Sequence, residues 1–137
     1  MRQRSKARAW ALQVLYAWEA RGDAPLDVVL EEFLARRRIA PARRPYLRRL
    51  IENVADELDT VDDALRAVVT NWRLDRLSVI DRNILRLGAV ELLRFDDVPP
   101  RVSIQEALRL AERYGTDQSP RFVNGVLDAL MKRLDGA

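Results

Sequence analysis

The chain has 137 residues, of which 48% are hydrophobic and 33% charged, with a net charge of +3; this is typical of one globular domain and excludes a disordered tail. Because cysteine and histidine are absent, disulfides, thiolate metal sites and the commonest general base are excluded. The basic start is followed by an apolar run broken by Gln13 with no small-residue cleavage site, and no stretch spans a membrane, so we expect a cytoplasmic protein.

Hydrophobic periodicity predicts helices along almost the whole chain. Two apolar series near the start of the chain have helical spacing. The first consists of Trp10, Ala11, Val14, Leu15 and Trp18, and the second of Leu26, Val29, Leu30, Phe33 and Leu34. A third series runs from Leu47 to Val68, and we expect it to form two helices with a break near residues 59–62. A further helix is predicted from about Ser78 to Arg94.

Two more helices are predicted in the last third of the chain, after the prolines at 99 and 100 have stopped the preceding one. Ser103 and Glu106 have the spacing of a capping box, and Gly115 is placed to end that helix. Ser119 and Pro120 open the last one. Since no strand is predicted, the fold class is all-α, a compact bundle of about seven short helices.

Charge is distributed unevenly along the chain. Residues 1–49 carry 12 Lys or Arg and 5 Asp or Glu, a net charge of +7, whereas residues 50–137 carry a net charge of −4. A second basic run consists of Arg36, Arg37, Arg38, Arg43, Arg44, Arg48 and Arg49. An acidic run consists of Glu52, Asp56, Glu57, Asp59, Asp62 and Asp63. This asymmetry indicates a polyanion on one face and a basic partner on another, and solvated helix faces are the alternative for each run.

No catalytic motif is recognisable. The five glycines form no phosphate-binding loop, no cluster of metal ligands occurs, and no nucleophile lies beside a base. Paired carboxylates such as Asp62 and Asp63 are interpreted as a solvated helix face. We therefore expect neither an enzyme nor a cofactor or metal site.

The stretch SPRFVNGVLDAL at 119–130 fits a helix except at Asn124 and Gly125, which are poor helix formers. Arg121, Phe122 and Asn124 lie at the helix start, where free backbone N–H groups favour anions. Gly125 would let RNA or another helix approach closely. Alternatively, Phe122 belongs to the core, Asn124 caps the helix locally and Gly125 serves helix packing.

Four segments together resemble the NusB family of bacterial transcription antitermination factors. They are ARAWALQVLYAWE at 7–19, VIDRNILRLGAVELL at 79–93, DVPPRVSIQEALRLAERYG at 97–115 and FVNGVLDAL at 122–130. The resemblance implies one RNA-binding domain, 1–137, with approximate subdomains 1–58 and 59–137. It also implies binding to the boxA element of rRNA leader and spacer transcripts together with the ribosomal protein NusE. That complex joins other Nus factors and RNA polymerase and opposes premature termination.

Cations, amides and one aromatic ring make up the expected RNA site, because single-stranded RNA is read by phosphate contacts, stacking and base-edge hydrogen bonds. The predicted RNA-binding residues are Arg2, Arg4, Lys6, Arg8, Gln13, Gln118, Arg121, Phe122 and Asn124. Lys6, Gln13 and Tyr16 share a stripe with Arg2 if the first helix begins that early. The family has an acidic or polar loop residue before the last helix, where this chain has Asp117 and Gln118.

For NusE, the resemblance implies contacts at Tyr16 and Asp81, because an acidic residue beside an aromatic anchor suits a basic ribosomal protein. The alternatives are a half-buried core tyrosine and a first-turn aspartate that faces the helix dipole.

Two other functions stay open. A NusB-like domain also precedes rRNA cytosine methyltransferases, where it assists an enzyme, but no cofactor-binding domain follows residue 137, so a free-standing factor is expected. The second is a helical protein-interaction module without antitermination activity, whose arginines only keep it soluble.

Overall fold

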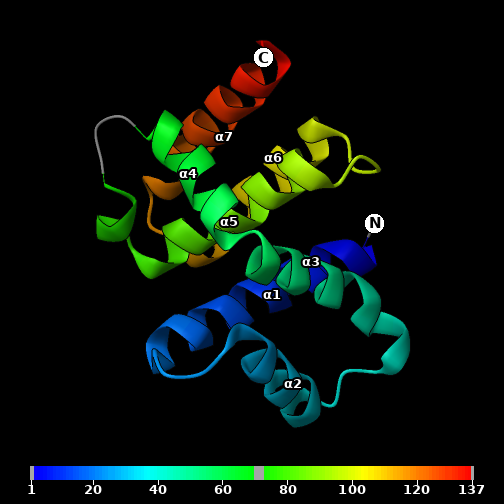
Figure 1. The fold of residues 1–137 in the computed structure, drawn as a ribbon. Coiled ribbons are helices and arrows are strands. Elements are labelled where there is room, and N and C mark those ends of the chain that lie inside the picture. The colour runs from blue at the N-terminus through cyan, green and yellow to red at the C-terminus, as the bar shows by residue number, and fades with distance from the viewer. Residues whose placement is uncertain (1, 70–72, 137) are drawn as a thin grey trace.

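The computed structural model describes residues 2–69 and 73–136, and these are almost entirely helical (Figure 1). The described residues form seven α-helices, which are α1 (Arg2–Arg21), α2 (Leu26–Arg37), α3 (Arg44–Asp56), α4 (Leu58–Val68), α5 (Val79–Arg94), α6 (Pro100–Tyr114) and α7 (Ser119–Gly136). Two 3-10 helices, Pro41–Arg43 and Leu74–Arg76, precede α3 and α5. The all-α prediction is confirmed. Within the described ranges, every helix is too short or too polar to cross a bilayer.

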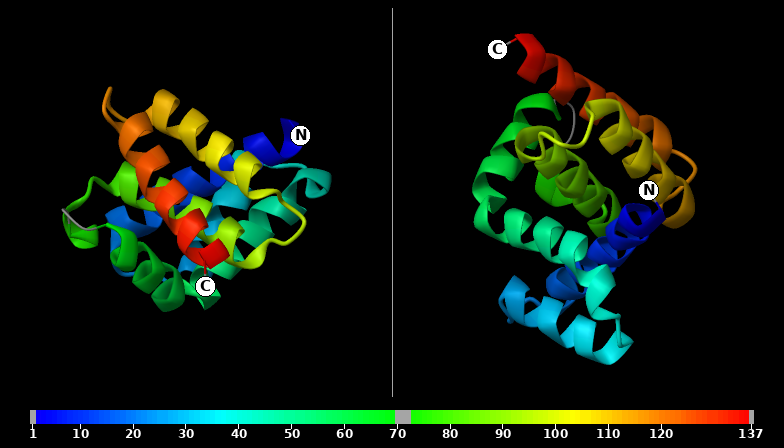
Figure 2. Two further views of the ribbon diagram at one scale, coloured as in Figure 1. Left: turned by 90° about the horizontal axis from the view of Figure 1, so that it is seen from above. Right: turned by 90° about the vertical axis from the view of Figure 1, so that its right-hand side faces the viewer.

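The central helix of the bundle is α5, which contacts α1, α3, α4, α6 and α7. All its residues from Arg82 to Glu91 are buried. At Gly88 an added Cβ would lie 2.6 Å from Cδ1 of Leu127 in α7, so a larger residue would displace the buried Leu127 side chain and glycine favours this close packing. Figures 1 and 2 show α1, α2 and α3 together at one end of the molecule and α7 at the other.

Several predicted helix ends are confirmed. The helix expected from about Ser78 to Arg94 is α5, and the backbone N–H of Asp81 donates to Ser78 Oγ at 3.1 Å, so Ser78 caps its start. Gly115 follows the last residue of α6. The break between α3 and α4 is at Glu57, and the prediction of residues 59–62 is wrong. Asp59 lies instead in the first turn of α4, where a negative charge is favourable beside the helix N-terminus.

The predicted capping box at Ser103 and Glu106 is also wrong. The helix α6 begins at Pro100, because proline suits the first helical position, and both residues therefore lie inside the helix. Ser103 Oγ donates to Glu91 Oε1 at 2.7 Å, and Glu106 Oε1 accepts from Arg8 Nη1 at 3.2 Å.

These two residues belong to a buried polar group, the Arg8 cluster, which consists of Arg8, Tyr46, Glu91, Ser103 and Glu106 and joins α1, α3, α5 and α6. Arg8 Nε lies 2.7 Å from Glu91 Oε2, and the two side chains are 6% and 2% exposed. Tyr46 Oη also donates to Glu91 at 2.7 Å. Burial opposes the charge on Arg8, but the hydrogen bond and charge of Glu91 raise the pKa of Arg8 above its ordinary value. The cluster is thus a fully paired ionic contact inside the bundle.

We expect Arg8→Met to lower the free energy of unfolding by about 3–5 kcal/mol, because it leaves the buried carboxylate of Glu91 without its counter-ion. Urea denaturation measures this loss. The matched control is Arg66→Met, which removes an exposed ion pair with Asp63 and should cost less than about 1 kcal/mol. Equal losses in the two variants would contradict a structural role for the Arg8 cluster.

Candidate functional site

The outer face of α1 carries most of the predicted contacts from the first third of the chain. Because α1 begins at Arg2, the stripe expected from the sequence exists. Lys6 is exposed, Gln13 is half-buried and Tyr16 is 49% exposed. The side chain of Arg2 lies outside the described residues.

Two of the predicted N-terminal cations already have partners in the protein. Arg8 is 5% exposed and lies in the Arg8 cluster, so its prediction as a phosphate contact is corrected. Arg4 remains at the surface, where Nη2 lies 3.2 Å from Asp97 Oδ2 and the guanidinium lies 4.5 Å from the centre of the Tyr46 ring. Lys6 forms no ion pair with any described residue, so its charge is available to a ligand.

Sequence reasoning missed two cations beside Lys6. Arg109 and Arg113 of α6 line a cleft between α6 and α1, together with Lys6 and Gln105. Arg109 is 74% exposed and makes only a 3.6 Å contact with Glu106. The sequence contains an indication of this pair, because residues 109 and 113 lie four apart in a predicted helix and therefore share one face of it.

A second cleft, of about 220 Å³, lies where α5 and α7 begin. Asp81, Gln118 and Phe122 all line it. Asp81 Oδ1 is buried and has no hydrogen-bond partner among the described residues. The structure thus places the predicted protein contact Asp81 beside two predicted RNA contacts that are distant in the sequence.

The surroundings of the residues that begin α7 decide between the alternatives for Gly125 but not for Phe122. Phe122 is half-buried and packs against the core while it also lines the cleft. Arg121, Asn124 and Gly125 are exposed. A Cβ added at Gly125 would meet nothing within 4 Å, so the interpretation of Gly125 as a packing glycine is wrong. Gly88 has that role instead.

A second ionic group, the Glu19 cluster, joins α1 to α5 and α4. It consists of Glu19, Asp62, Arg82, Asn83 and Arg86. Arg82 Nη2 lies 2.7 Å from Glu19 Oε1, and Arg86 contacts both Glu19 Oε2 at 3.2 Å and Asp62 Oδ1 at 2.9 Å. Since Glu19 lies one turn after Tyr16 and Arg82 directly follows Asp81, the cluster fixes the two predicted partner contacts relative to each other.

The family of the chain follows from comparison with known proteins, because the NusB family model matches residues 5–132. The chain belongs to the NusB family. The transcription antitermination protein NusB of Sorangium cellulosum is 45% identical, with 98% of this chain and 95% of that protein covered. The NusB of Desulfosudis oleivorans is 38% identical, with 100% and 90% covered.

Solved NusB structures have the same fold. T. maritima NusB aligns with a TM-score of 0.88 at 40% identity and covers 94% of this chain and 90% of its own. A crystal structure of the antitermination factors NusB and NusE in complex with dsRNA aligns with a TM-score of 0.86 at 29% identity and covers 97% and 98%.

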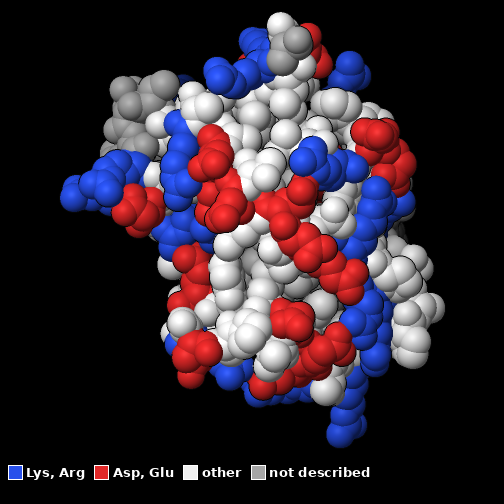
Figure 3. Space-filling view, viewed as in Figure 1, with Lys and Arg blue, Asp and Glu red and all other residues white. Residues whose placement is uncertain are grey.

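In this NusB-family chain the acidic run is partly internal. Asp62 is 7% exposed and pairs with Arg86, so its interpretation as a solvated residue is wrong, and Glu57 pairs with Arg94. Glu52, Asp56, Asp59 and Asp63 remain exposed. Figure 3 shows acidic side chains across the middle of the face that carries α3 and α4, with basic side chains towards its edges.

The Glu19 cluster of this NusB-family chain predicts a pH dependence. Burial would raise the pKa of Glu19, but hydrogen bonds from Arg82 and Asn83 and the charges of Arg82 and Arg86 outweigh it and lower the pKa below the ordinary 4.5. A lowered folded-state pKa adds stability that is present above the unfolded-state pKa and is lost as the pH falls through the folded-state pKa.

We therefore expect the difference in unfolding free energy between the wild type and Glu19→Gln to be constant above pH 4.5, the ordinary glutamate value, and to shrink below it. Denaturation at several pH values between about 3 and 7 measures this difference. A difference that does not change over this range would show that Arg82 and Arg86 do not stabilise the Glu19 charge.

Proposed function

We propose that this chain is an RNA-binding transcription antitermination factor that binds boxA-like single-stranded RNA of nascent rRNA transcripts together with the ribosomal protein NusE. With other Nus factors and RNA polymerase, the complex promotes processive transcription through terminators. The observation that best supports this proposal is the cleft between α5 and α7, where Asp81 lies beside Gln118 and Phe122. Adjacent contacts of this kind would let RNA and a protein partner bind side by side in one assembly.

On the RNA side, the proposed contacts combine charge with base recognition. Lys6, Arg109, Arg113 and Arg121 present cations to the phosphates, which supply most of the affinity but no sequence preference. The half-buried Phe122 ring offers a stacking surface, and the nearby amides of Gln118 and Asn124 hydrogen-bond to base edges.

On the protein side, Tyr16 and Asp81 are the proposed contacts with NusE. Tyr16 is one of the large apolar side chains that remain exposed, at 49%, and exposed aromatic residues serve as interface anchors. Asp81 Oδ1 lacks a partner among the described residues, and an unpaired buried acceptor is costly until a donor reaches it. Asp81 is half-buried and lines the cleft, so a lysine or arginine of a basic partner would pair with the accessible part of its carboxylate.

The proposal is tested by fluorescence anisotropy with boxA-like and scrambled RNA, each as a single strand and as a duplex, with and without NusE. We expect single-stranded boxA-like RNA to bind most tightly, and NusE to tighten its binding further. Binding of NusE without any RNA binding would favour the protein-interaction or methyltransferase-accessory alternative.

The protein side of this test uses Asp81→Lys, which places like charges across the contact with the basic partner. We expect the gain in affinity from NusE to be lost, while binding of RNA alone is not weakened, because the added positive charge lies beside the proposed RNA contacts, and the melting temperature stays close to wild type. Full affinity of the variant for NusE in calorimetric titration would remove Asp81 from the interface.

For Phe122, we expect Phe122→Ala to weaken RNA binding by about 1–3 kcal/mol, because a stacking surface is lost, and Phe122→Trp to preserve it. Since the ring is only half-buried, alanine should cost less than the roughly 3–5 kcal/mol of stability typical of a fully buried phenylalanine. Anisotropy and urea denaturation on the same variants separate the two effects. Unchanged RNA affinity of the folded alanine variant would assign Phe122 to the core.

A further inference from the structure

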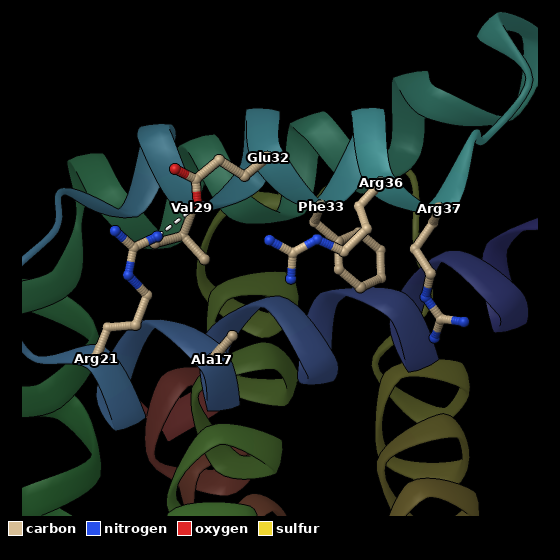
Figure 4. Close-up of a pocket in the computed structure, with 7 residues that line it drawn as sticks. All are labelled: Ala17, Arg21, Val29, Glu32, Phe33, Arg36 and Arg37. Atoms are coloured by element: carbon tan, nitrogen blue, oxygen red, sulfur yellow. Dashed lines mark hydrogen bonds and ion pairs between the residues drawn. The ribbon is translucent and has the colours of Figure 1, made fainter.

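A groove of about 520 Å³ lies between α1 and α2, and none of the contacts proposed above uses it. Ala17 and Arg21 of α1 form one wall, and Phe33, Arg36 and Arg37 of α2 form most of the other. Figure 4 shows the guanidinium groups of Arg36 and Arg37 to either side of the Phe33 ring. The groove therefore contains an aromatic ring and the first two arginines of the second basic run.

The charges in the groove leave it positive. Its carboxylate, Glu32, is already paired with Arg21. The guanidinium of Arg37 lies 5.3 Å from the centre of the Phe33 ring and donates to Gln13 Oε1. Arg36 is exposed and forms no ion pair with any residue of the described ranges. A ligand that enters this groove thus meets two cations, Arg36 and Arg37, that have no carboxylate partner among the described residues, beside the half-buried ring.

Other arginines of the second basic run already have partners in the protein. Arg48 pairs with Glu31 and Arg49 with Asp97, while Arg44 Nε donates to the backbone oxygen of Ile39 at 2.7 Å. Arg38 and Arg43 are exposed but do not line the groove. Arg36 and Arg37 are therefore the arginines of the second basic run that line the groove, and the groove is distinguished by its lining and not by charge alone.

We propose that this groove is a second RNA subsite, in which Phe33 stacks on one unpaired base and Arg36 binds the adjacent phosphate. An aromatic face, a guanidinium and an amide are the groups that bind single-stranded RNA. An acidic peptide would use the arginines but not the ring. The inference rests on the proposed function. Gln13, a predicted RNA contact, accepts a hydrogen bond from Arg37 of the groove, so RNA bound along α1 would reach the groove at this residue.

The subsite lengthens the RNA path. The groove is on α2, at the opposite end of the molecule from α7 (Figures 1 and 2). RNA that contacts both Phe122 and Phe33 would therefore pass along the outer face of α1, past the exposed Lys6 and the half-buried Gln13. A short RNA bound at α7 does not reach the groove, so the contribution of the groove depends on RNA length.

The test compares Arg36→Glu/Arg37→Glu with Arg38→Glu/Arg43→Glu in the full chain. Both variants change the net charge equally, within the same basic run. With a single-stranded RNA of about 16 nucleotides we expect a loss of affinity of about tenfold in the groove variant and less than about threefold in the control. The log–log salt slope should fall by ~0.7 for the lost phosphate contact. With an RNA of about 4 nucleotides that carries only the boxA-like core, the two variants should bind equally well.

Phe33→Leu and Phe33→Tyr separate stacking from charge. Leucine keeps an apolar side chain against the core but has no aromatic face, so binding of the longer RNA should weaken by about tenfold, whereas tyrosine should preserve it. Circular dichroism and melting temperature verify that each variant is folded.

Equal losses in the two arginine pairs would show general charge attraction and overturn the subsite. So would loss of NusE binding with RNA binding intact, which would make the groove a protein contact. If the wild type binds RNA but the groove variants match it, only this inference fails; if the wild type binds no RNA, the proposed function fails as well.

Discussion

The buried ion pair between Arg8 and Glu91 fixes where α1 lies against the rest of the bundle. Charges inside a protein are stable only when they are paired and hydrogen-bonded, and here Tyr46, Ser103 and Glu106 complete the pairing. A shift of α1 by one residue would leave Glu91 buried without its counter-ion. The Glu19 cluster applies the same constraint near the other end of α1. Together they hold the stripe of Lys6, Gln13 and Tyr16 in one register against α5 and α6.

The helices could be predicted from the sequence wherever apolar periodicity and end signals agree. α5 begins next to Ser78 and α6 ends before Gly115, both close to the predicted positions, because a capping serine and a glycine act locally. The errors come from contacts distant in sequence. Ser103 and Glu106 have a capping-box spacing, but Ser103 bonds to Glu91 of α5 and Glu106 to Arg8 of α1. A signal for Arg8 was present, since residue 8 is in phase with Leu12 and Leu15 on the buried face of α1.

Of the candidate site, the sequence could indicate single residues but not how they are grouped. Nothing in the spacing of Asp81 and Phe122 predicts one cleft, because their proximity depends on how α5 and α7 pack around Gly88. The net charge of a stretch of sequence is also a poor guide to where unpaired cations lie, because ion pairs and burial depend on contacts between distant residues. The basic first third loses Arg8 to the interior and Arg48 and Arg49 to ion pairs. The cations of Arg109 and Arg113 come instead from a part of the chain with net negative charge.

The two poor helix formers in α7 also have a physical reason. A glycine inside a helix costs about 1 kcal/mol relative to alanine, and such a cost is usually offset by close packing, as at Gly88 against Leu127. Gly125 has no such contact, and Asn124 beside it is exposed. Gly125 therefore lowers the stability of α7 without a packing contact to offset it, and it does so on an exposed surface one turn from Phe122. A helix backbone without a side chain admits a flat ligand closer than alanine would, which favours the proposed contact with RNA over a purely architectural origin of this pair.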